Sequence, residues 1–144
     1  MRGKAWRCMA ALTMSGLLPA VLSGCVQHAP HEHDVTLGGA QCVPANSSAA
    51  SGSSTLRVLP DGRVTGSVRH TGMVATGAQL HAAPAGANGP AIVTLHKTGE
   101  GSFAAPPDAQ LTPAQYARYQ AGGVYVTIHS VAYPAGEIRA QLRP

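Results

Sequence analysis

The chain has 144 residues, of which 11% are charged and 4% are aromatic, and its formal net charge is +4. The ten basic residues are spread along the chain, whereas nucleic-acid binding needs a concentrated positive surface. Nucleic acid is therefore set aside as a partner.

The first 24 residues are typical of a secretory signal peptide. A basic start, MRGKAWR, precedes the apolar run CMAALTMSGLLPAVL, and LSGC follows, ending at Cys25. LSGC resembles the bacterial lipobox, whose cysteine becomes the lipid-bearing first residue; the alternative is a secreted protein cut near Gly24. The apolar run is short for a membrane span and contains Pro19, so no permanent transmembrane helix is expected. We expect lipid on Cys25 to anchor the chain in the cell envelope, at the outer membrane facing the periplasm or at the cell surface.

Residues 25–34 are predicted to form a polar tether. Removal of the signal leaves seven basic and six acidic residues, a net charge of +1. It also leaves Cys42 without a disulfide partner in an oxidising compartment, so this thiol is reactive, metal-binding or buried. The tether either is a plain spacer or collects metal ions loosely through three histidines: His28, His31 and His33.

Residues 35–144 have the usual size of one domain and are predicted to be all-β. Short runs rich in Val, Leu and Thr are separated by Gly and Pro turn signals: VTLGGAQCV, STLRVLP, RVTGSVRHTG, TGAQLHAA and PAIVTLHK. This spacing favours an antiparallel sandwich or barrel. His70 and His96 fall near strand ends, where we expect them to be solvated.

One short helix is predicted near residues 113–121, within LTPAQYARYQAGG. Thr112 stands at the N-cap, Pro113 at the first helical position and Gln115 at the third, which together form a capping box. Gly122 is expected to end the helix in a left-handed conformation.

The last hairpin, VYVTIHSVAYPAGEIRAQL, alternates between an apolar and a polar face. All its apolar residues can face one core only if the numbers of paired residues sum to an even value. His129 then stands opposite Glu137 or Arg139, and in AQLHA the side chain of His81 also points away from the core. The polar face is either a binding site or the solvated side of an antiparallel sheet.

Two blocks of the sequence, GAQLHAAPAGANGPAIVTL and LTPAQYARYQAGGVYVTIHSVAYPAGEIRAQL, resemble the chordin-type (CHRD) domain. The resemblance implies an immunoglobulin-like β-sandwich, secreted or lipid-anchored in bacteria, with no enzymatic activity firmly attached to it. The chain departs from the family pattern at three positions. Gln79 replaces the first histidine of a pair, Thr127 replaces an asparagine, and Cys42 stands where an acid is frequent.

Two hypotheses follow for the function. The first is a non-catalytic binding or interaction module in the cell envelope, in which a structural polar network is formed by Tyr125, Glu137, Arg139 and Gln141. The second is a periplasmic protein that binds copper or zinc through Cys42, His81 and His129, because thiolate and imidazole suit those ions. No nucleophile elbow, carboxylate pair or cofactor loop stands out, so an enzyme is not expected.

Overall fold

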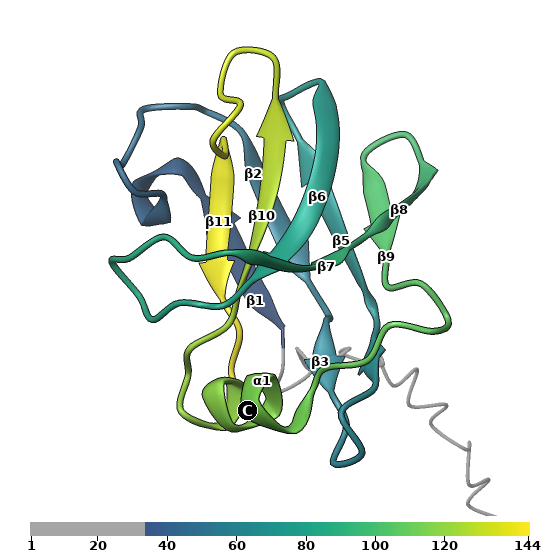
Figure 1. Cartoon of the computed structure of the whole chain (residues 1–144). Coiled ribbons are helices and arrows are strands. Elements are labelled where there is room, and N and C mark those ends of the chain that lie inside the picture. The colour runs from purple at the N-terminus through teal and green to yellow at the C-terminus, as the bar shows by residue number, and fades with distance from the viewer. Residues whose placement is uncertain (1–33) are drawn as a thin grey trace, which may run out of the picture.

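The computed structural model of the chain describes residues 34–144 (Figure 1). The predicted signal peptide, Cys25 and the histidines of the tether lie outside the described residues. Within the described part of the chain, no helix is long and apolar enough to cross a membrane.

Nine antiparallel strands form one continuous sheet, in the order β7-β6-β10-β11-β1-β2-β5-β9-β8. Their bounds are β1 Val35–Gly38, β2 Ser51–Ser54, β5 Ser67–Thr71, β6 Ala75–His81, β7 Ala91–Thr94, β8 His96–Gly99, β9 Ser102–Ala104, β10 Tyr125–Ser130 and β11 Ile138–Gln141. A separate two-stranded pair is formed by β3 (Arg57–Val58) and β4 (Val64–Thr65). The prediction of an antiparallel β fold with one short helix is confirmed.

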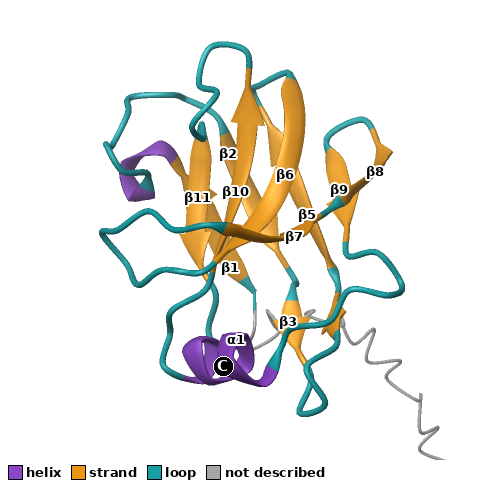
Figure 2. Ribbon diagram, viewed as in Figure 1, coloured by secondary structure: helices purple, strands orange, loops and turns teal. Residues whose placement is uncertain are grey.

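The sheet curls round an aliphatic core and almost closes on itself (Figure 2). Val126, Ile128 and Leu80, from the central strands, are fully buried on its inner face. The amide of Leu95, between β7 and β8, donates to the carbonyl of Ala78 in β6, 2.9 Å away. This bond draws the β7–β8 segment back against β6 and narrows the opening of the near-barrel.

The helix α1 (Pro113–Gln120) closes one end of the sheet (Figure 1). Its capping box is present: the amide of Gln115 donates to Thr112 Oγ1 at 3.2 Å, and the amide of Thr112 donates to Gln115 Oε1 at 2.8 Å. Gly122 ends the helix with a φ of 73°, and its amide donates to the carbonyl of Tyr119. The predicted start and end of the helix are therefore confirmed.

The first predicted strand, VTLGGAQCV, is shorter than expected. After β1 the chain turns through the 3-10 helix η1 (Gly39–Gln41), where the Gly39 carbonyl accepts the amides of Cys42 and Asn46. Any side chain at position 39 would collide with Asn46, so glycine is required where this turn folds back. Cys42 therefore follows a turn beside β11 and is not part of a strand.

Candidate functional site

The register of the last hairpin puts the polar side chains on the outer face of the sheet, as the parity of its apolar residues predicts. Thr127 in β10 pairs with Arg139 in β11, and Tyr125 pairs with Gln141. On the other side of β10, Tyr125 pairs with His81 of β6. The two candidate histidines, His81 and His129, therefore lie on adjacent strands.

This outer face is covered and is not the solvated side of a sheet. Tyr125 and Thr127 are each 3% exposed, and Arg139 is 2% exposed. Part of the cover is residues 83–90, the covering loop, which runs from β6 to β7 across the outer face (Figure 1). Gly89 lies so close to the carbonyl of Ala82 that any side chain there would collide with it.

The guanidinium of Arg139 holds the covering loop in place by hydrogen bonds to two of its carbonyls. Its Nη1 donates to the carbonyl of Ala87 at 2.8 Å, and its Nη2 donates to the carbonyl of Pro84 at 3.1 Å. The guanidinium carbon lies 3.5 Å from the centre of the Tyr125 ring. Burial lowers the pKa of Arg139, an effect that the neighbouring Tyr125 and Cys42 partly oppose.

Gln141 and Tyr125 hold the same loop. Gln141 Nε2 donates to the carbonyl of Ala83 at 2.8 Å, and the amide of Gly89 donates to the Tyr125 hydroxyl at 3.1 Å. Three of the four residues assigned to a structural polar network therefore converge on one loop.

Glu137, the fourth, is held separately. Its carboxylate accepts from Ser48 Oγ at 2.5 Å, and its carbonyl accepts from Asn46 Nδ2 at 3.1 Å. Among the described residues it forms no ion pair with Arg139. Each of these buried charges is stabilised by neutral hydrogen-bond partners.

The two histidines are fixed in matching ways. His81 Nδ1 lies 2.9 Å from the carbonyl of Gly89, and His129 Nδ1 lies 3.0 Å from the carbonyl of Pro134. Their ring centroids are 5.9 Å apart, and the His81 ring stacks on Tyr125. Burial lowers the pKa of His129, and the nearby His81 acts in the same direction.

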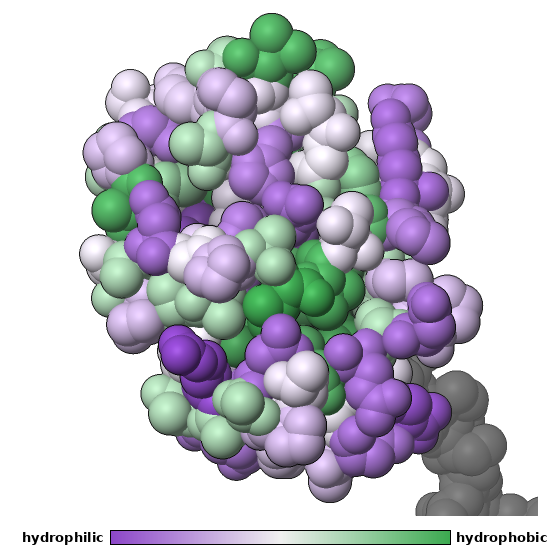
Figure 3. Space-filling view, viewed as in Figure 1, coloured by the Kyte–Doolittle hydropathy of each residue, from purple (hydrophilic) through white to green (hydrophobic). Residues whose placement is uncertain are grey.

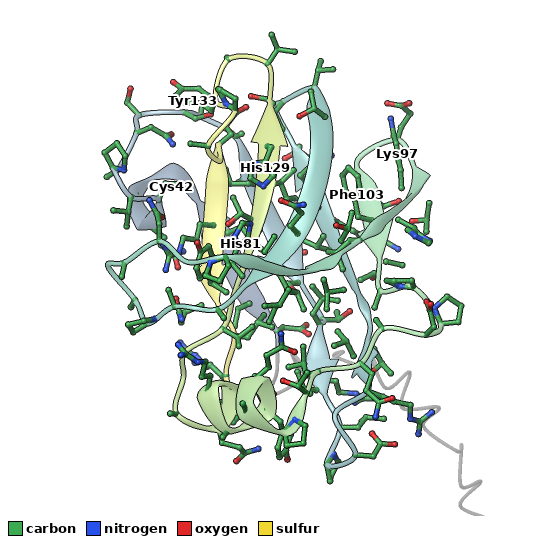
Figure 4. All side chains as sticks on the ribbon, in the orientation of Figure 1. Cys42, His81, Lys97, Phe103, His129 and Tyr133 are labelled. Carbon is green, nitrogen blue, oxygen red and sulfur yellow. The ribbon has the colours of Figure 1, made fainter. Side chains whose placement is uncertain are left out.

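Cys42 does not join the histidines (Figure 4). Across the described residues, no three His, Cys, Asp or Glu side chains gather as metal ligands, so the proposed Cys42–His81–His129 set is not formed. Cys42 lies beside β11, near Arg139, whereas His81 on β6 stacks on Tyr125 of β10, so β10 separates Cys42 from His81 in the sheet.

The thiol of Cys42 is instead buried beside a cavity of about 210 Å³ that Arg139 and Gln141 also line. Burial raises its pKa, against the opposing effects of Arg139 and Asn46. A buried thiol with a raised pKa has little thiolate character, which makes it a poor nucleophile.

Comparison with protein families identifies the fold family. The model of the CHRD domain matches residues 34–142. The chain belongs to the CHRD family. No curated protein and no solved structure matches the chain.

In this CHRD domain, Gln79 stands where the family usually has the first histidine of its pair. It lies opposite Thr127, and its amide donates to Thr94 Oγ1 at 3.3 Å. A glutamine therefore occupies the position on β6 between Gly77, which pairs with His129, and His81.

The CHRD domain has a further feature that the sequence did not single out, at the end of the sheet away from α1. There Val74 and Val131 are 86% and 84% exposed. Figure 3 shows hydrophobic residues gathered on the surface at this end of the molecule. They lie in the β5–β6 and β10–β11 turns, which adjoin because Ser130 pairs with Ala75. We call these two turns the distal end. The sequence does not predict this pair, because a valine in a turn is not part of a periodic pattern. Only the pairing of β6 with β10 in the structure shows that the two turns are neighbours.

A cavity of about 380 Å³ opens beside Val74, lined also by Met73, Lys97 and His70. The expectation that His70 is solvated is wrong: both its ring nitrogens are buried, without a hydrogen-bond partner in the described part of the chain, and its ring stacks on Phe103. Burial lowers the pKa of His70, and Lys97 acts in the same direction. His96 is exposed, as expected.

Proposed function

We propose that this CHRD domain is a non-catalytic interaction module, anchored in the cell envelope by lipid on Cys25, that binds a partner protein at its distal end. The observation that carries the proposal is the pair of exposed valines on adjoining turns, Val74 and Val131, of which Val74 lines the His70 cavity. Exposed apolar side chains that gather in one place mark interaction sites, whereas single ones are common on any protein surface.

The position of the distal end supports this role. Gly38, Ser51 and Thr71 share one end of the sheet, next to the β5–β6 turn, whereas Val35 pairs with Ser54 at the opposite end. The chain therefore enters the domain at the end remote from Val74. A domain anchored through residues before Val35 presents its distal end away from the anchor.

The polar face supports a non-catalytic role. Arg139, Gln141 and Tyr125 are engaged in binding the covering loop. We also infer that the curled sheet corresponds to the immunoglobulin-like sandwich that the family resemblance implies, because antiparallel strands enclose one aliphatic core.

Site-specific photo-crosslinking of the full chain in its native envelope tests the proposal. A photoreactive amino acid at Val74 or at Val131 should give the same discrete crosslinked product. One at Ala114, exposed on α1 at the other end, should give none. A product that forms equally well from position 114, or no product from either valine position, would contradict binding at the distal end.

Anchoring is tested in parallel. The unsubstituted chain should label with radioactive palmitate and sediment with membranes, and Cys25→Ser should abolish both properties. A membrane-bound Cys25→Ser chain would show that the lipid is not the anchor.

A further inference from the structure

Three polar atoms on the outer face of β6 and β10 are buried and have no hydrogen-bond partner within residues 34–144. They are His81 Nε2, His129 Nε2 and Thr127 Oγ1. A buried polar atom left unpaired costs about 1–3 kcal/mol, so three on one face point to a missing occupant.

The state of the histidines follows from their other nitrogens. The carbonyls of Gly89 and Pro134 can only accept hydrogen bonds, so Nδ1 carries the hydrogen in both rings. In the neutral imidazole Nε2 then holds a free lone pair. A ring fixed by an Nδ1–H bond to a backbone carbonyl, with Nε2 free, has the arrangement of a metal-ligating histidine.

The spacing of the rings fits one shared ion. Imidazole nitrogens bind such ions at about 2.0 Å, so two rings that bind the same ion have centroids at most about 6.4 Å apart. The observed 5.9 Å between the ring centroids of His81 and His129 lies within this limit.

We propose that His81 and His129 form a site for one Cu(I) ion, each binding through Nε2. This site does not depend on the proposed docking role. Two features of the site, the number of ligands and the charge of the surroundings, favour Cu(I) over Zn²⁺. Since no third His, Cys, Asp or Glu joins the pair in the described residues, the site suits an ion that accepts two ligands, as Cu(I) does, whereas Zn²⁺ takes four.

The charge of the surroundings selects the same ion. No carboxylate or thiolate of the described residues joins the pair, and the Arg139 guanidinium lies over Tyr125, on which His81 stacks. Because the cost of burying an ion rises with the square of its charge, a divalent ion would cost about four times as much here. Imidazole is a suitable ligand for copper.

Competitive titration of Cu(I) against a chromophoric chelator under anaerobic reducing conditions tests the site. The protein is the full chain in detergent, freed of other accessible ligands by Cys8→Ser, Cys25→Ser, His28→Ala, His31→Ala and His33→Ala. One equivalent of Cu(I) should bind, and His81→Ala or His129→Ala should each weaken binding by about 100-fold or more. Cys42→Ser and the exposed His96→Ala are matched controls that should leave the affinity unchanged.

If the His81→Ala or the His129→Ala variant fails to fold, nitrogen NMR of the same chain with both histidines present and isotopically labelled gives a second test of the site. Before copper, His81 and His129 should both show the neutral Nδ1–H form, and Cu(I) should shift their Nε2 resonances. The proposal is overturned if no Cu(I) binds and the Nε2 resonances do not move. That result would mean that a buried water fills the site. It is also overturned if Cys42→Ser or His70→Ala removes binding instead.

Discussion

Arg139 is the residue on which the covering loop depends most. It is 2% exposed and donates to the carbonyls of Ala87 and Pro84, of which that of Pro84 also accepts the amide of Ala87 at 3.2 Å. We predict that Arg139→Ala lowers the free energy of unfolding by about 3 kcal/mol, because the covering loop loses two hydrogen bonds from a charged donor. Arg139→Lys should recover only part of this loss, because an ammonium group cannot reach both carbonyls as a planar fork does.

Urea denaturation measures the effect, with Arg57→Ala as the control because Arg57 is exposed on β3. That change should alter the free energy of unfolding by less than about 0.5 kcal/mol. Equal effects of the two substitutions to alanine would mean that the covering loop does not depend on Arg139.

The buried histidines predict how stability depends on pH. Burial lowers the folded-state pKa of His70 and of His129, so below their ordinary pKa of about 6.5 the unfolded chain binds protons that the folded chain does not. Their contribution to stability is complete above that pH and is lost as the pH falls through the lowered folded values.

Urea midpoints measured between pH 7.5 and 5.5 check this prediction. Stability should decrease toward pH 5.5, and the decrease should be smaller when His70→Asn and His129→Asn are combined. Stability that increases on acidification over this range would show that the histidines are not held in the neutral form.

At the scale of elements, the helix cap provides a local prediction. Thr112 Oγ1 accepts the amide of Gln115, so Thr112→Ala should cost about 1 kcal/mol. Thr112→Ser keeps the hydroxyl and should keep most of the stability. An unchanged denaturation midpoint in the alanine variant would show that the cap contributes nothing.

The helix could be predicted from the sequence because all its signals lie within about ten residues. The capping box, the proline at the first helical position and Gly122 act on their own turn of the chain. The face on which each side chain of the last hairpin lies could also be predicted, because the side chains of a strand alternate with period two.

The sequence does not predict that the covering loop lies over the polar face of the sheet. Arg139 meets residues of the covering loop that lie 52 and 55 positions earlier, and no local pattern encodes that contact. The grouping of Cys42 with His81 failed for a related reason. Alternation places a residue on a face only while its strand continues, and the turn at Gly39 ends β1 before the chain reaches Cys42.

At the scale of the whole molecule, the described residues share one continuous sheet and one aliphatic core. We predict that residues 35–144 fold without the preceding segment. Expressed alone, they should unfold in a single cooperative transition, measured by circular dichroism during heating. A gradual, non-cooperative loss of signal would show that the preceding residues are required.

The central claim is that the distal end, away from the tether, binds a partner protein. The most direct measurement is the size of the native complex formed by the full chain, resolved on a native gel from mildly solubilised envelopes. Because Val74 and Val131 are exposed, replacing both by serine should leave the unfolding free energy within about 0.5 kcal/mol of the original. We predict that the unsubstituted chain migrates in a larger complex and that the double variant migrates alone, whereas Ala114→Ser leaves the complex intact. A complex that survives the loss of both valines, or one that Ala114→Ser disrupts, would contradict the claim.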